Sequence, residues 1–318
     1  MATLPSRPLT RPSAAGDVHV SRIALGCMGL SGTWNPAEFD AAKVRRGVTA
    51  VEAAWACGVT LYDFADIYGG GTSEQVWKEA LVAVPGLRER AVVCTKAGIR
   101  FAADGAPYRY DHSFPYLITA LEASLRRLGV ERVDLLLLHR PDPLAHPREA
   151  ARALNTLVRS GKVGAVGVSN YTPAQVRALQ AFLDQPLVAS QPSFSLWNLR
   201  PMEDGTLDIC EELDLLPMAY SPLAGGLLGG RRDIKEDDPQ RKRFEGLRAE
   251  LARQAEAHGC TATQVALAWL IAHPAGVVPV VGSTNPEHIA EAAGATGVQL
   301  SREDWYRLWV AGRGAGIP

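Results

Sequence analysis

The sequence predicts an α/β fold, a single (β/α)8 TIM barrel with one additional C-terminal helix. Short runs rich in β-branched residues or leucine alternate with longer amphipathic stretches from about residue 20 onward. This alternation is typical of repeated βα units that build a parallel sheet. Eight such runs occur, which is the number that closes this barrel. The length of 318 residues also suits one α/β barrel.

The predicted strands are short and apolar, and polar or glycine-containing segments bound them. In chain order they span Ile23–Leu25, Val59–Tyr62, Ala91–Cys94, Val133–Leu138, Val163–Val168, Leu187–Ala189, Leu216–Tyr220 and Val277–Val280.

Helices are expected between these strands, where apolar residues recur at helical spacing. The clearest series is Leu117, Leu121, Leu125 and Leu128. Helix starts are indicated where an N-cap residue precedes proline, as in Thr172-Pro173 and Asn285-Pro286.

Two segments interrupt the regular alternation. Ser221–Lys242 is rich in glycine and then highly charged, and Ser301–Ala311 has the pattern of the additional terminal helix. Residues 1–16 are predicted to be a mobile N-terminal extension, and residues 17–318 to form the barrel domain. The extension lacks an apolar run long enough for a signal peptide or a membrane span. An organellar targeting segment is the alternative interpretation.

The composition of the chain indicates which classes of binding partner to expect. Lys and Arg number 33 and Asp and Glu number 34, so the net charge of -1 gives no electrostatic reason to expect nucleic acid or an anionic membrane. Five widely spaced cysteines without a CxxC pair argue against a disulfide framework and a zinc site. We therefore expect a cytoplasmic protein with a small-molecule ligand and no metal, and we leave open whether it forms a homo-oligomer.

Four reactive side chains lie where predicted strands end. Asp63 closes the run VTLYD and Tyr68 follows it within DFADIYG, whereas Lys96 ends VVCTK and His139 ends LLLLH. The C-terminal ends of the strands in a parallel barrel form one rim, so these side chains are expected to converge.

Such a set suits the reduction of a carbonyl group, which needs a hydride at carbon and a proton at oxygen. Tyr68 would donate the proton, since a free phenol has a pKa of roughly 10. A neighbouring Lys96 ammonium would lower that pKa, and Asp63 would hold the ammonium in place. His139 would orient the carbonyl oxygen.

Each of these residues alone is more often structural, as a packed ring, a solvated charge or a turn cap. Their joint position at the strand ends of three consecutive βα units is what favours catalysis.

The sequence resembles the aldo/keto reductases, a family of NAD(P)H-dependent (β/α)8 barrels. Asp63, Tyr68, Lys96 and His139 match the catalytic tetrad of that family, in which the tyrosine is the general acid. The segments LLLLHRPDP, SGKV and GVSNYTPAQ are especially similar to a bacterial oxidoreductase branch. The resemblance implies reduction of an aldehyde or ketone to an alcohol.

No GxGxxG motif follows the first strand, so dinucleotide binding in the Rossmann manner is not expected. The resemblance implies instead that Ser169, Asn170 and Gln191 bind the nicotinamide carboxamide and that Tyr220 stacks on its ring. An amide needs both donors and acceptors, and a flat ring suits an aromatic face.

The loop that begins at Ser221 resembles the segment that covers the pyrophosphate in the family. The residues expected to bind there are Ser221, Leu223, Gly225 and Gly226, whose backbone could approach phosphate closely. A flexible surface loop is the alternative from composition alone.

The end of the last strand is expected to bind the adenosine 2′-phosphate through Gly282, Ser283 and His288 near a helix N-terminus. Many relatives have lysine or arginine around this position, and Ala292 stands where an adenine-binding asparagine is common. The resemblance favours NADP(H), and these two departures from the family pattern keep NAD(H) as the second candidate.

The substrate pocket is expected to include Trp34, Arg140 and Trp197, with Tyr108 and Phe194 as further candidates. Arg140 would favour a carboxylated carbonyl compound or would pair with Asp142.

Two other functions are compatible with the sequence. The same fold and tetrad occur in auxiliary β subunits of potassium channels, in which a bound nucleotide serves sensing more than turnover. Alternatively, Lys96 with a lowered pKa would form a Schiff base in a barrel aldolase.

Overall fold

Eight parallel strands close into a barrel in the computed structural model, which describes residues 6–8, 19–103 and 105–317. Each strand pairs with the next one along the chain, and the last pairs with the first. The barrel strands are β3 (Ala24–Gly26), β4 (Leu61–Asp63), β5 (Val92–Ala97), β8 (Val133–Leu138), β9 (Val163–Ser169), β10 (Leu187–Gln191), β11 (Leu216–Tyr220) and β12 (Val278–Val281). The predicted fold class is confirmed, and each of the eight predicted strands overlaps one of these, with bounds that differ by up to three residues.

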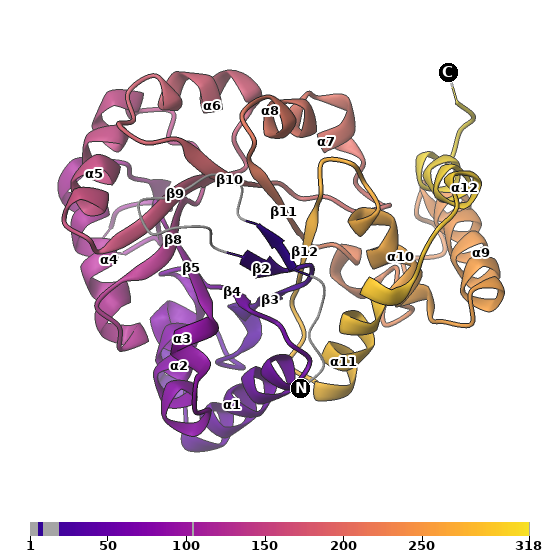
Figure 1. Ribbon diagram of the computed structural model, residues 1–318, viewed down its shortest axis with the longest axis horizontal. Helices are drawn as coiled ribbons and strands as arrows, with labels where there is room; N and C mark the ends of the chain where they lie inside the picture. Colours follow the sequence, from indigo (N-terminus) through magenta and orange to yellow (C-terminus); the bar gives the residue numbers. More distant parts are fainter. Residues whose placement is uncertain (1–5, 9–18, 104, 318) are drawn as a thin grey trace.

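A ring of helices surrounds the barrel (Figure 1). The helices are α1 (Ala41–Ala56), α2 (Thr72–Ala83), α3 (Leu87–Arg90), α4 (Phe114–Leu128), α5 (Pro147–Arg159), α6 (Pro173–Gln180), α7 (Arg200–Glu203), α8 (Thr206–Glu212), α9 (Arg241–Ala257), α10 (Ala262–Ile271), α11 (Pro286–Gly294) and α12 (Arg302–Arg313). Two short hairpin strands, β6 (Ile99–Arg100) and β7 (Arg109–Tyr110), follow β5.

The barrel interior is filled by alternate residues of the strands. Leu135 and Leu137 of β8 and Leu216 and Met218 of β11 belong to one buried cluster there. The intervening residues, such as Leu136, face the helices in a second cluster. This period of two fixes the register of each strand, because a slip by one residue would exchange the two faces.

The helix signals in the sequence are confirmed. Thr172 caps α6 in a reciprocal capping box with Gln175, and the Asn285 side chain caps α11. The four predicted leucines of α4 are all buried, and the helix ends at Gly129, whose φ of 69° permits the left-handed turn.

The additional terminal helix is α12, which packs beside α9 outside the ring (Figure 1). Its Trp305 stacks on Trp269 of α10 with ring centroids 4.9 Å apart. Each indole N–H donates to the backbone carbonyl of the other tryptophan, at 3.0 and 3.1 Å. These bonds satisfy two buried donors while the rings cover apolar surface.

Of the predicted N-terminal extension, only β1 (Ser6–Pro8) belongs to the described residues. It pairs antiparallel with β2 (His19–Ser21), which precedes β3 and lies in front of the barrel centre in Figure 1. The remainder of residues 1–16 lies outside the described part. Among the helices of the described residues, none is long and apolar enough to cross a membrane.

Gly167 of β9 allows β10 to lie close to it. A Cβ at this position would be 2.6 Å from the Ala189 carbonyl oxygen and 2.6 Å from Leu137 Cδ2. Because a backbone carbonyl cannot move aside, Gly167→Ala is expected to lower the free energy of unfolding by about 1–3 kcal/mol. Urea denaturation measures this change.

The matched control is Gly246→Ala in α9, where an added Cβ meets nothing within 4 Å. That substitution should stabilise the protein by about 0.5–1 kcal/mol, since glycine is unfavourable within a helix. Equal effects of the two substitutions would contradict this account of the strand contact.

Candidate active site

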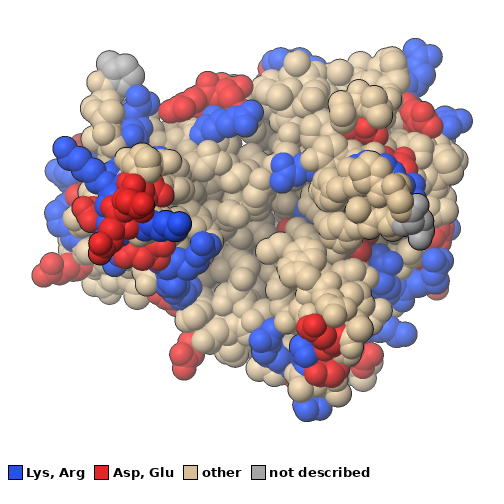
Figure 2. All heavy atoms as spheres, turned by 180° about the vertical axis from the view of Figure 1, so that it is seen from behind, with Lys and Arg blue, Asp and Glu red and all other residues tan. Residues whose placement is uncertain are grey.

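A cavity of about 750 Å³ opens where the barrel strands end. Figure 2 shows that the face opposite β2 is hollowed near its centre, with mostly uncharged surroundings and Lys and Arg at the edge. Most of the predicted site residues line the cavity: Trp34, Asp63, Tyr68, Tyr108, His139, Arg140, Ser169, Asn170, Gln191, Tyr220, Ser221, Leu223, Gly225, Gly226, Gly282, Ser283 and His288. Lys96 is fully buried behind this wall.

The floor of the cavity contains a buried ion pair. Lys96 Nζ lies 2.8 Å from Asp63 Oδ2 and donates to the Phe64 carbonyl at 2.8 Å and to the Tyr68 hydroxyl at 3.2 Å. Asp63 Oδ1 accepts from Gln191 Nε2 at 3.0 Å. The three ammonium protons therefore have three acceptors, one of which is the phenol oxygen of Tyr68.

This arrangement keeps Lys96 charged. Burial lowers the pKa of Lys96, but the effects that raise it, of which the charge of Asp63 is the largest, outweigh burial, so the pKa lies above its ordinary value. An amine that stays protonated is a poor nucleophile. The structure therefore opposes the Schiff-base interpretation, which required a lowered pKa.

The expected lowering of the Tyr68 pKa is not found. Burial raises the pKa of the phenol, and this effect exceeds the opposing effect of the Lys96 charge. The sequence-based expectation considered the ammonium but not the desolvation of the phenolate. Tyr68 is consequently a protonated donor across the neutral pH range.

His139 is a neutral imidazole in this site. Burial, and then the charges of Lys96 and Arg140, lower its pKa to about 2. Its ring lies edge-on to Tyr68 with centroids 6.0 Å apart. Nδ1 is buried and has no hydrogen-bond partner among the described residues, which leaves Nε2 as the nitrogen able to meet a ligand.

A hydrogen-bonded chain of polar groups forms the next part of the wall. The Tyr220 hydroxyl donates to Asn170 Oδ1 at 2.8 Å, and Asn170 Nδ2 lies 2.8 Å from Ser169 Oγ and 3.3 Å from the His139 carbonyl. Ser169 Oγ donates to the Gln191 carbonyl at 3.0 Å. These contacts fix the orientation of amide and hydroxyl groups that face the cavity.

The backbone beside this chain is strained. Asn170, Ser221 and Ala224 have φ values of 63°, 51° and 50°, a left-handed conformation that residues other than glycine rarely adopt. Strain of this kind is concentrated at ligand-binding sites. Gly225 and Gly226, also at positive φ, complete a turn whose backbone is open to the cavity.

Two arginines at the end of the cavity formed by the glycine-rich loop were not among the predicted site residues. Arg231 and Arg232 line it near Gly225 and Gly226. Arg231 pairs with Glu291 at 2.6 Å, whereas Arg232 has a contact of 3.5 Å with the Gly225 carbonyl and no ion pair among the described residues. Their position shortly after the glycine-rich run was the available signal. From the sequence, the arginine-rich segment Arg231–Arg243 is most simply interpreted as a solvated loop, with a lid over the cofactor as the alternative.

The cavity mouth is aromatic. Trp34, Phe101 and Tyr108 are each about half exposed, and Phe101 lies edge-on to Trp34 with centroids 6.4 Å apart. Arg140 lies in the wall beside His139 and has no ion pair in the described part of the chain. The expected alternative pairing of Arg140 with Asp142 is therefore not observed.

Trp197 and Phe194 do not line the cavity. The Trp197 ring packs on Arg243 and lies edge-on to Phe244, with ring centroids 5.8 Å apart. Phe194 is fully buried against Trp269. Both side chains contact the helices after β11, because the loop that contains them bends toward α9 and α10.

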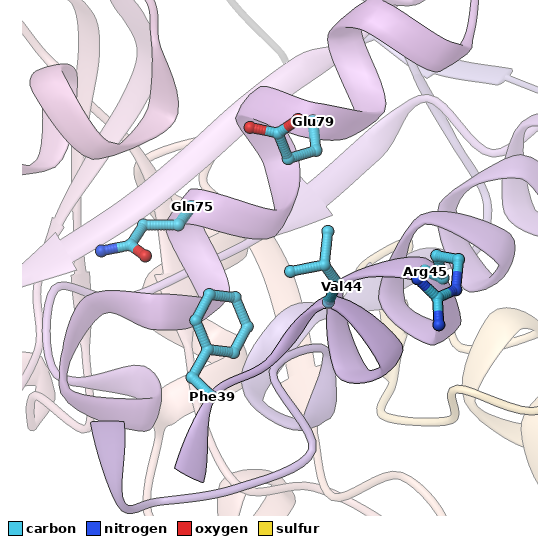
Figure 3. Close-up of a pocket in the computed structure, with 6 residues that line it drawn as sticks. Phe39, Val44, Arg45, Gln75 and Glu79 are labelled. Atoms are coloured by element: carbon cyan, nitrogen blue, oxygen red, sulfur yellow. The ribbon is translucent and has the colours of Figure 1, made fainter. Parts of the chain in front are cut away.

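A smaller hollow of about 290 Å³ lies between α1 and α2, away from the strand ends (Figure 3). Its labelled residues include Phe39, Val44 and the exposed side chains of Arg45, Gln75 and Glu79. It contains no predicted site residue. No group of three or more metal-ligating side chains occurs among the residues described.

Comparison with known proteins agrees with this geometry. The model of the aldo/keto reductase family matches residues 22–309. The chain belongs to the aldo/keto reductase family.

Similar proteins extend over the whole length of this aldo/keto reductase. A 6-dehydroglucose reductase from Novosphingobium aromaticivorans is 42% identical and covers 100% of both chains. A second protein of that name, from Agrobacterium fabrum, is 38% identical over 95% of this chain and 97% of its own. The structure of a glycerol dehydrogenase from Gluconobacter oxydans superposes with a TM-score of 0.83 at 27% identity, over 100% of this chain and 98% of that one.

These findings confirm the family resemblance drawn from the sequence. Family membership and the oxidoreductases among the relatives support carbonyl reduction by this aldo/keto reductase.

Proposed function

We propose that this aldo/keto reductase is NAD(P)H-dependent and reduces an aldehyde or ketone to an alcohol, with Tyr68 as the proton donor. The observation that supports this most strongly is the buried Asp63–Lys96 pair whose ammonium donates to the Tyr68 hydroxyl at the cavity floor. A general acid of this kind contributes about 10²–10⁴-fold to rate.

The cavity fits a nicotinamide nucleotide. Ser169, Asn170 and Gln191 offer the donors and acceptors that a carboxamide needs, and Tyr220 offers an aromatic face. The left-handed backbone at Ser221 and Ala224 brings main-chain groups toward the cavity, where a pyrophosphate would bind. When bound, the nicotinamide supplies the hydride.

The protein's own residues hold the proton and donate it to the carbonyl oxygen. Tyr68 remains protonated because burial raises its pKa, and Lys96 favours the phenolate that forms when the proton leaves. Asp63 and the Phe64 carbonyl hold Lys96 in place. His139 Nε2, on a ring that stays neutral, positions the carbonyl oxygen beside Tyr68.

We propose NADP(H) as the preferred cofactor and NAD(H) as the second candidate. The family resemblance supports the first choice. Arg232, which contacts the Gly225 carbonyl and has no ion pair among the described residues, would suit a phosphate group of either nucleotide, because the loop at Gly225 is where the pyrophosphate is expected. The absence of a lysine or arginine at Gly282 and His288 keeps NAD(H) as the alternative.

The names of the relatives suggest a polyhydroxylated aldehyde as the substrate class. Arg140 supports a substrate with an anionic or polyhydroxyl group near the carbonyl, since its guanidinium lies beside His139 and has no ion pair with any residue that the structure describes. The aromatic mouth of Trp34 and Tyr108 would contact the apolar faces of such a molecule.

Arg140→Gln is expected to raise KM roughly tenfold for a sugar aldehyde or a carboxylated aldehyde, because a charge-assisted hydrogen bond is lost. KM for an unsubstituted aliphatic aldehyde should change little. Steady-state kinetics on the two substrate types measure the difference, and Arg200→Gln on the surface is the matched control. An equal rise for both types would contradict a role of Arg140 in substrate binding.

The proposal as a whole is tested by carbonyl-dependent oxidation of NADPH and NADH over a panel of aldehydes and ketones. We expect turnover with at least one nucleotide, and the rate ratio gives the coenzyme preference. Tight nucleotide binding without turnover would instead favour the sensing role of an auxiliary subunit. Borohydride trapping of substrate on Lys96 without nucleotide would favour the aldolase.

A further inference from the structure

Three consecutive glycines separate Tyr68 from helix α2. Gly69, Gly70 and Gly71 have φ values of 59°, 65° and 96°, and α2 begins directly after them at Thr72. Glycine is the residue with the greatest backbone freedom, so this segment gives the phenol little rigidity of its own. Contacts with neighbouring elements therefore hold Tyr68 at its place in the cavity.

The segment before Tyr68 is held by the backbone of β5. The Phe64 N–H donates to the Cys94 carbonyl at 2.8 Å, and the Asp66 N–H donates to the Lys96 carbonyl at 3.0 Å. These bonds continue the pairing of β4 with β5 beyond the end of β4. The N-terminal side of the Tyr68 turn is thus fixed to the strand that contains Lys96.

The segment after Tyr68 is held by a side chain, that of Glu74 in the first turn of α2. Glu74 is fully buried; its Oε1 accepts from the Thr95 hydroxyl at 2.7 Å, and its Oε2 accepts from Arg127 of α4 at 2.7 Å. Successive residues of a strand point to opposite faces, so Thr95 reaches α2 from the outer face of β5 while Lys96 lies on the inner face. The Thr95–Glu74 bond therefore fixes the start of α2 to the same strand.

Arg127 contacts the glycine turn directly. A Cβ at Gly71 would lie 2.7 Å from both Cδ and Nε of Arg127. Glu74 holds this arginine and Thr95 at the same time, which requires two acceptor oxygens. A carboxylate has two such oxygens and an amide has one. Glu74 thus connects β5, α4 and the glycine turn, and glutamine at this position could not make both bonds.

We propose that Glu74 and Thr95 are positioning residues for Tyr68: their buried hydrogen bond sets where α2 begins relative to β5, and thereby the place of the Tyr68 hydroxyl beside Lys96. That hydroxyl lies 3.2 Å from Lys96 Nζ, so a small outward shift of the turn would break the contact. Neither Glu74 nor Thr95 lines the cavity, so both act on turnover through Tyr68 and not through binding. The inference rests on the proposed function, in which Tyr68 is the proton donor.

Thr95→Val removes the hydroxyl and keeps the volume of the side chain. It is expected to lower kcat roughly tenfold while KM and the nucleotide Kd stay within about twofold, because a displaced catalytic group slows the reaction without changing the cavity. The matched control is Thr206→Val, which removes a buried hydroxyl that donates to the Asp204 carboxylate at 2.6 Å, next to α8. This control should keep the wild-type kcat. An unchanged kcat in Thr95→Val, or an equal loss in both variants, would overturn the proposal.

Thr95→Ser separates the hydrogen bond from stability. Serine retains the hydroxyl but leaves a methyl-sized gap, so the thermal unfolding midpoint should fall by about 2–4 °C while kcat stays within about twofold of the wild type. Glu74→Gln should lose kcat as Thr95→Val does, because the amide oxygen serves only one of the two donors. If kcat followed the unfolding midpoint across these three variants, and not the bond between hydroxyl and carboxylate, the role would be merely structural and the proposal would be refuted.

The double variant Thr95→Val/Tyr68→Phe shows whether the effect passes through Tyr68. Single-turnover rates of Tyr68→Phe should be the same with and without Thr95→Val, since the position of a missing hydroxyl has no effect. A further tenfold loss in the double variant would contradict the positioning role. Tyr68→Phe alone reports on the proton donor separately: wild-type turnover in that variant would overturn the proposed function, and this inference with it.

Discussion

Tyr68→Phe is expected to lower kcat by about 10²–10⁴-fold while leaving nucleotide binding nearly unchanged. The substitution removes the only hydroxyl group in the described site that Lys96 contacts, at 3.2 Å, and leaves the ring and its edge-on contacts with Trp34 and His139. Steady-state kinetics and a nucleotide titration by fluorescence measure the two quantities.

A matched control is available in β4, the strand that precedes Tyr68. Tyr62 is fully buried, and its hydroxyl bonds to the Val59 carbonyl at 3.2 Å outside the cavity. Tyr62→Phe should therefore retain turnover within a few-fold. If Tyr68→Phe kept comparable activity, another group would have to deliver the proton and the assignment of Tyr68 would be wrong.

Lys96→Met is expected to lower the free energy of unfolding by about 3–5 kcal/mol, because it leaves the Asp63 carboxylate buried without its cation. The side chains of Lys96 and Asp63 are 0% and 4% exposed, so water cannot replace the lost partner. The Gln191 amide, at 3.0 Å from Oδ1, would still donate to this side chain, but it carries no charge. Urea denaturation measures the loss.

The double variant Lys96→Met/Asp63→Asn should recover most of that stability, since neither charge is then unpaired. Turnover should remain low in both proteins, because the ammonium that supports Tyr68 is absent. If the single variant lost less than about 1 kcal/mol of unfolding free energy, or the double variant recovered none, Lys96 and Asp63 would not form the stabilising buried ion pair described here.

The sequence was sufficient to predict the barrel because the strands have a simple physical signature. Eight apolar runs such as Val133–Leu138 alternate with amphipathic helices, and consecutive strands pair in order around the closed sheet. The convergence of Asp63, Tyr68 and His139 followed from this topology, since all three lie at or just after C-terminal strand ends.

Other features depend on distances that no sequence pattern contains. The pKa of Tyr68 reflects a competition between burial and Lys96, and the sequence supplied only the second of these. Trp197 bends away to contact Arg243, whereas Arg232 reaches the cavity from a loop whose composition resembled a solvated segment.

The central claim is that this protein transfers a hydride from a nicotinamide nucleotide to a carbonyl carbon while Tyr68 donates the proton. Hydride transfer in a single turnover tests this claim most directly. Nucleotide carrying deuterium at the transferable position of its nicotinamide is mixed with the enzyme and an aldehyde, and the product is analysed by NMR. The account predicts an alcohol with one deuterium on the former carbonyl carbon, formed by the wild type and far more slowly by Tyr68→Phe. Bound nucleotide that transfers no deuterium to any aldehyde or ketone of the panel would contradict it.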